Sequence, residues 1–175
     1  GWLYRWEKCI PAYVEWEMKR AAQWQAEASE IKREQKFLEG ETQVTLTGRI
    51  DRLDQSKNGY GIIDYKTGSV PSRHEVLQGE NIQLPFYALL LEQENVTQAT
   101  FLALDDEDVK EKTTLDGQSL ALLRTAVRER LILLKRRLDA GTPLPAWGDM
   151  ETCRICEMEG LCRREMWAEP ESSAS

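Results

Sequence analysis

The sequence has little histidine and no long apolar run. Only one of its 175 residues is a histidine. A membrane-spanning helix needs about 20 consecutive apolar residues, and a secretory signal needs an apolar core behind a basic start; neither pattern is present. A glycine-rich phosphate loop and a dinucleotide fingerprint are also missing, so we expect no ATP site in this chain. These absences predict a soluble cytoplasmic module with no membrane partner.

Acidic side chains outnumber basic ones by 30 to 23, which gives a net charge of -7. Because phosphate binding is driven largely by lysine and arginine, this balance does not favour a nucleic-acid ligand. The charges are uneven, however, since residues 105–111 form an acidic run and residues 124–137 carry six basic side chains. A local basic face that binds nucleic acid therefore remains an alternative. The 41% hydrophobic content and six tryptophans predict a folded domain.

The spacing of apolar residues predicts a mixed α/β domain. A helical period runs from Trp2 to about residue 28, and Pro11 is expected to end a first short helix and begin a second. Further along we expect a strand over 35–46, two strands joined at Asn58-Gly59, a loop over 69–72, a helix from about Ile82, strands over 99–104 and 109–115, and a helix from the N-cap Asp116 to about Ala140. The expected parts of a single domain over 1–175 are N-terminal helices (2–34), a core (35–140), a tail (141–167) and a disordered end (168–175).

The stretch from Gly48 to Gly68 brings three charged side chains together. It reads as a β-hairpin that carries Asp51 on the first strand and Asp64 and Lys66 on the second. Side chains alternate along a strand, so Asp64 and Lys66 emerge on the same face. Two carboxylates suit a hard cation such as Mg²⁺, and a neighbouring lysine suits the positioning of a water molecule. The alternative is an ordinary charged pair on a surface hairpin.

Residue types that bind metals gather near the C-terminus. Cys153, Cys156 and Cys162 form a Cys-x2-Cys-x5-Cys motif, and Cys9 lies far away in the sequence. Clustered cysteines in an intracellular chain indicate a metal or a cluster rather than disulfides, and both zinc and [4Fe-4S] fit four thiolates. Ordinary buried thiols are the alternative, above all for Cys9. The lone His74 is expected in a polar loop, either solvated or binding a phosphate or metal.

The ordered set of motifs resembles the RecB-type nuclease domain of the PD-(D/E)XK superfamily. The segments that carry the resemblance are Gly48-Arg49-Ile50-Asp51, Asp64-Tyr65-Lys66-Thr67-Gly68 and Gln83-Leu84-Pro85-Phe86-Tyr87. The terminal cysteine motif resembles the iron-sulfur staple of AddB-like members, which are nuclease subunits of bacterial double-strand-break repair complexes. The resemblance covers about residues 2–167. It implies a restriction-endonuclease-like core, in which helices flank a central mixed sheet, with a cysteine-bearing tail.

The resemblance also implies a role for each matched residue. Asp51, Asp64 and the backbone carbonyl of Tyr65 would bind the catalytic Mg²⁺ or Mn²⁺. Lys66 would orient the attacking water and stabilise charge on the phosphate. Gln83 and Tyr87 match a Gln-x3-Tyr motif that borders the active site and contacts DNA. The flanking residues are expected to be structural or DNA-facing: Arg49, Arg52 and Asp54.

Two features of the family are missing from the chain. Nothing before Asp51 matches the family's upstream helix, whose histidine completes the metal site, and the first cluster cysteine commonly lies further upstream. We therefore expect that the chain begins after both, which leaves Cys9 as a candidate fourth ligand by elimination. The isolated chain would then lack the cluster and much of its activity, although its core could still fold.

Three functions follow from these patterns. The first is a metal-dependent DNA exonuclease domain that acts beside a helicase partner near the bacterial nucleoid. The second is an inactive or incomplete DNA-binding or scaffold module on the same fold, which the intact Asp/Asp/Lys set argues against. The third is a zinc-stapled interaction domain whose hairpin carboxylates merely lie on the surface.

Overall fold

The computed structural model describes residues 2–105, 108–143 and 153–162. The chain divides into two compact units, residues 1–133 and 134–175, and the assignment of residues 1–175 to one domain stays a prediction.

The elements are α1 (Trp2–Arg20), β1 (Gln25–Glu39), β2 (Thr42–Ser56), β3 (Gly59–Lys66), α2 (Arg73–Leu77), α3 (Gln83–Leu90), β4 (Val96–Asp105), β5 (Asp108–Asp116), α4 (Gly117–Asp139) and α6 (Glu159–Cys162). The predicted disordered end, 168–175, lies outside the described residues. No helix in the described ranges is long and apolar enough to cross a membrane.

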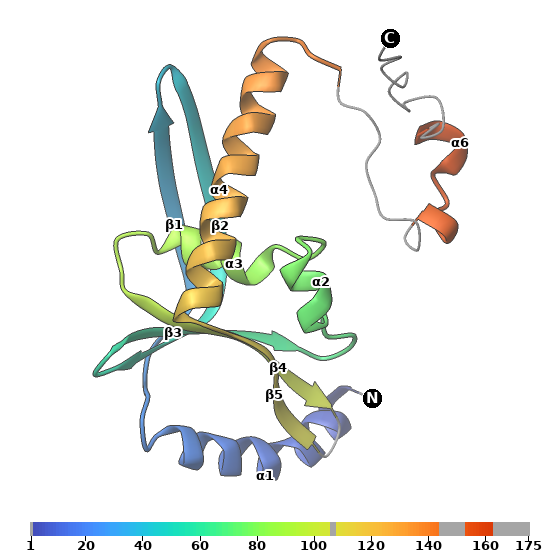
Figure 1. Ribbon diagram of the computed structural model, residues 1–175. Helices are drawn as coiled ribbons and strands as arrows, with labels where there is room; N and C mark the ends of the chain where they lie inside the picture. The colour runs from blue at the N-terminus through green and yellow to red at the C-terminus, as the bar shows by residue number, and fades with distance from the viewer. Residues whose placement is uncertain (1, 106–107, 144–152, 163–175) are drawn as a thin grey trace. The chain divides into compact units, whose positions relative to one another are not determined.

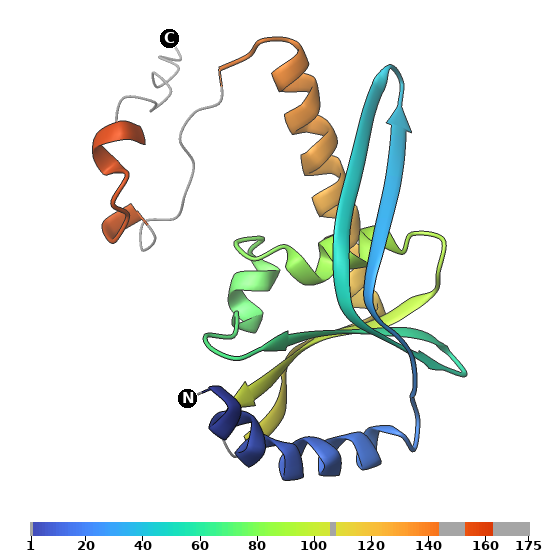
Figure 2. The ribbon, with the colours of Figure 1, turned by 180° about the vertical axis from the view of Figure 1, so that it is seen from behind.

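A five-stranded mixed sheet organises the first unit. Its strand order is β1-β2-β3-β4-β5, with β3 and β4 parallel and the other neighbours antiparallel. Helix α1 lies on one side of the β3–β5 part of the sheet, and α2 and α3 lie on the other side (Figures 1 and 2). The predicted α/β class and helix-flanked mixed sheet are confirmed.

Each face of the sheet has its own hydrophobic core. On the α3 face, fully buried residues such as Ile62, Leu84 and Phe101 form the larger core, which also receives Leu120 from α4. On the α1 face, Cys9 packs against buried residues of β3 and β4 such as Ile63. Since strand side chains alternate between faces, β3 contributes to both cores, and all four of its residues from Gly61 to Asp64 are buried.

The N-terminal prediction needs two corrections. Residues 25–34 belong to strand β1 rather than to a helix, and α1 is one continuous helix with Pro11 inside it. Residues 25–30 of β1 are all exposed, and over residues 31–37 the burial alternates, so Lys32 is exposed whereas Phe37 is buried. This segment is rich in residues that favour helices, but thirteen residue pairs with β2 hold it as a strand. Tertiary pairing therefore overrides local propensity.

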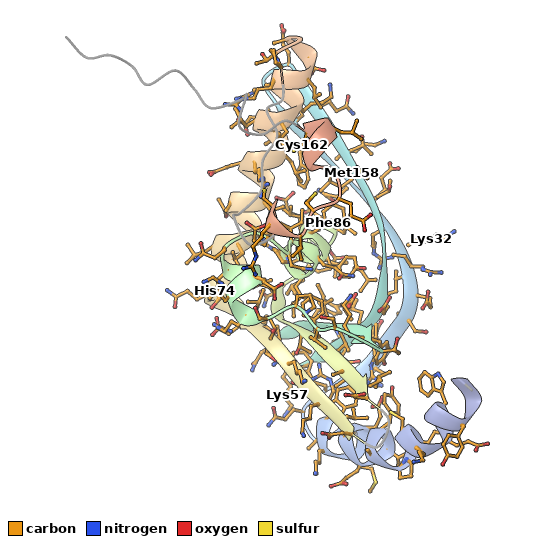
Figure 3. All side chains as sticks on the ribbon, turned by 90° about the vertical axis from the view of Figure 1, so that its right-hand side faces the viewer. Lys32, Lys57, His74, Phe86, Met158 and Cys162 are labelled. Carbon is orange, nitrogen blue, oxygen red and sulfur yellow. The ribbon has the colours of Figure 1, made fainter. Side chains whose placement is uncertain are left out.

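Helix α2 was not predicted. His74, expected in a loop, lies in this helix, and Figure 3 shows it there with Phe86 on α3. Ser72 begins α2 with a capping box: its side chain accepts a hydrogen bond from the Glu75 amide, and the Glu75 carboxylate accepts one from the Ser72 amide. The Ser-x-x-Glu pattern in the sequence was the available signal.

The expected single strand over 35–46 is wrong, because β1 ends at Glu39 and β2 begins at Thr42. Gly40 lies in the turn between them with a φ of 62°, and the pairing of β1 with β2 was not predicted.

The other local predictions are confirmed. The turn between β2 and β3 falls at Asn58, and Gly59 adopts a φ of 140°. The Asp116 side chain caps α4 by accepting a hydrogen bond from the Ser119 amide at 3.0 Å. At the other end of α4, Gly141 has a φ of 66°, as a helix-ending glycine often does.

Candidate active site

The site begins where strand β2 separates from β3. The two strands pair from Ser56↔Gly59 to Arg52↔Ile63. Beyond this point the backbone amide of Tyr65 donates to the carboxylate of Asp51 at 3.0 Å instead of to a strand partner. Asp51 directly precedes Arg52 of the last pair in the sequence, and its side chain accepts from a backbone amide of β3 that lies beyond the paired part of the two strands.

Asp64 and Lys66 lie side by side on β3. The Lys66 ammonium is 2.7 Å from Asp64 Oδ2, and the side chains are 23% and 2% exposed respectively. The ammonium also lies 5.1 Å from the centre of the Phe101 ring on β4. Their shared face, predicted from the two-residue spacing, is therefore confirmed. Because Asp64 is almost fully buried and Lys66 is half-buried, the two do not form an ordinary charged pair on a surface hairpin.

Helix α3 adds an amide and a hydroxyl to the same cluster. The Gln83 side chain accepts from Lys66 Nζ at 2.7 Å and donates to Asp64 Oδ1 at 2.6 Å and to the Tyr87 hydroxyl at 3.0 Å. Asn81 Oδ1 accepts from the Gln83 amide at 3.1 Å and so fixes the first turn of the helix. One glutamine thereby binds both charged residues of the strand.

The surroundings change the acidity of two groups. Burial raises the pKa of the Asp64 carboxyl and the charge of Asp51 raises it further, whereas the Lys66 ammonium lowers it. Burial also raises the pKa of the Tyr87 hydroxyl, and the charges of Asp64 and Asp51 add to that effect. The charge of one carboxylate thus acts on a second, buried carboxyl, an arrangement that functional centres often contain.

The donor set fits a hard divalent cation. Asp64 Oδ2 is buried and accepts no well-formed hydrogen bond among the described residues, although Lys66 lies close to it. Oxygen ligands from Asp51, Asp64 and the Tyr65 carbonyl match the preference of Mg²⁺, which usually keeps several waters as well. In the described ranges no three histidine, cysteine or acidic residues are placed to bind one metal ion, so waters or substrate would have to complete the shell.

The cysteines of the predicted site belong to different units of the chain. Cys9 is 4% exposed in the core of the α1 face, while the other three cysteines belong to the second unit. Within that unit Cys156 is exposed, and its sulfur accepts a hydrogen bond from the Met158 amide at 3.4 Å. The iron-sulfur or zinc site, and the role of Cys9 in it, therefore stay predictions.

Sequence reasoning missed a buried charge network on the opposite face. Asp54 on β2 accepts from Arg20 of α1 at 2.5 Å and from Arg52 at 2.6 Å, and Arg52 also pairs with Glu17. The Tyr13 hydroxyl lies 3.0 Å from that of Tyr65, which neighbours Asp64 in the chain. The structural role expected for Arg52 and Asp54 matches this network. The signal was weak, because the partners lie 34 and 35 residues apart.

Comparison with known proteins agrees with the fold. The family model of the PD-(D/E)XK nuclease superfamily matches residues 1–163, and the chain belongs to this superfamily. The solved structure "Crystal structure of SSO0001" is 17% identical with a TM-score of 0.42, and the match covers 85% of this chain and 66% of that chain. No curated protein matches.

Membership in this superfamily indicates a nuclease, and its members generally depend on divalent metals. The cluster of Asp51, Asp64, Lys66 and Gln83 lies where β3 meets α3, and it supplies the acidic and basic groups that such chemistry needs. The restriction-endonuclease-like fold is thus shown, whereas the individual roles of these residues belong to a proposal.

The raised pKa of Asp64 predicts that Asp64→Asn stabilises the metal-free protein. A carboxyl whose pKa is higher in the folded state than its ordinary 3.8 contributes stability below that pH, and the contribution is lost as pH rises through the folded-state pKa. Asparagine remains neutral, so we expect a higher Tm than wild type at pH 8 in EDTA and a smaller difference at pH 4, measured by circular dichroism.

The matched control is Asp108→Asn on exposed strand β5, which should change stability by no more than about 0.5 kcal/mol. A lower Tm for Asp64→Asn at pH 8 in EDTA would contradict the assignment of a buried, unfavourably ionised carboxylate.

Proposed function

We propose that the chain is a Mg²⁺-dependent DNA exonuclease domain. The observation that carries the proposal is the Lys66 ammonium, which contacts Asp64 at 2.7 Å and Gln83 at 2.7 Å, while the charge of Asp51 acts on the same Asp64 carboxyl and raises its pKa. A fixed positive charge beside two carboxylates is what hydrolysis of a phosphodiester requires. Mn²⁺ should replace Mg²⁺, because both accept an oxygen-rich site.

Each residue has a stated role in this proposal. Asp51, Asp64 and the Tyr65 carbonyl would hold the cation. When bound, the cation would polarise the phosphate and lower the pKa of a coordinated water. Lys66 orients the attacking water and places positive charge where the phosphate gains negative charge in the transition state. Its contact with Gln83 restricts the ammonium, so little reorganisation is needed during the reaction.

Gln83 and Tyr87 are proposed to contact the DNA at the edge of this centre. They lie four positions apart on α3, which places both on one face of the helix. The Tyr87 hydroxyl accepts from Gln83, and its own proton interacts with Asp64, whose pKa this hydrogen bond lowers. On DNA binding the hydroxyl would turn this proton to a phosphate oxygen. The helix would thereby position the substrate and also hold the lysine.

We further propose that the domain belongs to an AddB-like nuclease subunit that acts with a helicase partner in double-strand-break repair. The motif order and the cysteine spacing support this reading, and the chain itself has no ATP-binding motif. The helicase activity would therefore come from a partner. The expected location is the bacterial cytoplasm, at the nucleoid.

The cysteine tail is proposed to bind a [4Fe-4S] cluster with Cys153, Cys156 and Cys162, and with Cys9 as the candidate fourth ligand. The amide hydrogen bond to the Cys156 sulfur supports this, because such bonds stabilise a thiolate ligand. Anaerobic purification should give a brown protein with iron and sulfide, and Cys156→Ser should lose both. Stoichiometric zinc without iron would contradict the cluster, and retained iron in Cys9→Ala would remove Cys9 from the ligand set.

The second candidate is a catalytically inactive DNA-binding or scaffold module. End-labelled single- and double-stranded DNA separates the two functions when the protein, with any upstream segment in place, is incubated with Mg²⁺, Mn²⁺ or EDTA. An exonuclease releases short products from one end only when metal is present. DNA binding without release under all three conditions would favour the scaffold, and internal cuts in a circular substrate would indicate an endonuclease.

A further inference from the structure

A pocket lies on the α1 face of the sheet, which is the face opposite the one that α3 covers. Its volume is about 540 Å³, within the range of about 300–1,000 Å³ that small-molecule sites occupy. Helix α1, which lies below the sheet in Figure 2, and the segment after it form one wall, and β4 and β5 form the other. The side chains relevant to its chemistry are Trp16, Trp24, Arg20, Lys19, Lys110 and Lys112.

The aromatic part of the pocket is held in place by buried ionic contacts. The Arg20 side chain is 4% exposed and pairs with Asp54 at 2.5 Å and with Glu111 at 3.0 Å. Its guanidinium lies 5.4 Å from the Trp16 ring centre and 4.9 Å from that of Trp24. Glu111 also accepts from the Trp16 indole at 3.1 Å. Both indoles are therefore fixed before any ligand binds.

Three exposed lysines lie on the rim of the pocket, Lys19, Lys110 and Lys112. Lys19 pairs with Glu15 and Lys110 with Asp108, both on the exposed surface, whereas Lys112 has no ion-pair partner among the described residues. The nearby carboxylate of Glu111 is already compensated by Arg20, whose Nη2 is buried without a hydrogen-bond partner in the described part of the chain. Cations surrounding fixed aromatic rings form the combination that binds single-stranded nucleic acid, since bases stack on the rings and phosphates meet the cations.

We propose that this pocket binds a nucleotide of single-stranded DNA, at a point separate from the Asp51–Asp64–Lys66 centre. The inference rests on the proposed nuclease function, which supplies DNA as the substrate. Strand β5 is the edge of the sheet, so a strand that leaves the α3 face can reach the pocket around that edge. The pocket then provides a second contact for single strands that extend beyond the active site.

The test measures binding of a fluorescent 20-nucleotide oligo(dT) by anisotropy in EDTA, so that no hydrolysis is needed. The double variant Lys110→Glu/Lys112→Glu changes only exposed side chains and should raise Kd at least about tenfold. Losing two phosphate contacts should also reduce the slope of log K against log salt by about 1.4. Trp24→Leu should weaken oligo(dT) binding roughly fivefold to a hundredfold and leave a blunt 20-bp duplex unaffected, because paired bases cannot stack on the indole.

The matched control is Lys32→Glu/Lys36→Glu on strand β1, where Figure 3 shows Lys32 directed away from the strand. It carries the same charge change and should alter Kd less than twofold. Equal losses in both double variants, or an unchanged Kd in Lys110→Glu/Lys112→Glu, would overturn the pocket. Since binding is read without metal, these results are independent of whether wild type degrades DNA, which tests the nuclease proposal separately.

Discussion

Lys66→Ala is expected to lower kcat for DNA hydrolysis about 10²- to 10³-fold while leaving the fold intact. Removing one preorganised group that stabilises transition-state charge typically has an effect of this size. The side chain is 23% exposed and faces the acidic cluster, so truncation leaves no large cavity in either core. The loss should appear in kcat more than in KM, because the ammonium acts on charge that develops during the reaction.

Single-turnover hydrolysis of end-labelled DNA with Mn²⁺ measures this loss directly. Lys57→Ala, at the exposed turn between β2 and β3, removes the same chemical group and is expected to leave the rate unchanged. A Lys66→Ala rate within fivefold of wild type, with the same circular dichroism spectrum, would exclude a catalytic role for the lysine.

Asp54→Ala is expected to reduce the free energy of unfolding by about 3–5 kcal/mol. The carboxylate is fully buried between the guanidinium groups of Arg20 and Arg52, which are 4% and 8% exposed. Removing it leaves these two buried cations with only their partly exposed partners Glu111 and Glu17, and breaking a buried ion pair by removing one partner has a cost of this order. Because Arg20 belongs to α1, the helix should lose its attachment to β2 first.

Urea unfolding followed by tryptophan fluorescence gives this value, and Asp54→Asn keeps the shape of the side chain if the alanine variant does not fold. The control is Glu15→Ala, which breaks the exposed pair with Lys19 on α1 and should leave the free energy of unfolding nearly unchanged. A loss below about 1 kcal/mol in both Asp54 variants would show that the network does not hold α1 to the sheet.

The parts of the fold that depend on neighbouring residues were predictable. The Asn58-Gly59 turn, the Asp116 cap and the period of α4 are local signals, and each element begins or ends close to the expected residue. Strand β1 was not predictable in this way. Its first ten residues favour a helix locally, and their pairing with β2 decides their conformation.

The candidate site was likewise predictable within each helix or strand and not between them. Asp64 and Lys66 share a face because of strand geometry, and Gln83 and Tyr87 share one because of helix geometry. The spacing within each element could not show that Gln83 reaches both residues of β3, since 17 and 19 residues separate the partners. The family resemblance provided that link. The Arg20–Asp54 network had no comparable motif, and only the folded chain reveals it.

The central claim is that Asp64 belongs to a metal-dependent nuclease centre. The most direct measurement is degradation of labelled DNA by wild type and by Asp64→Ala, with Mg²⁺, Mn²⁺ or EDTA, using protein that retains any upstream segment. We predict that wild type degrades DNA only with metal and that Asp64→Ala, although folded, degrades none. Absence of degradation by wild type with either metal, or equal rates for the two proteins, would contradict the account.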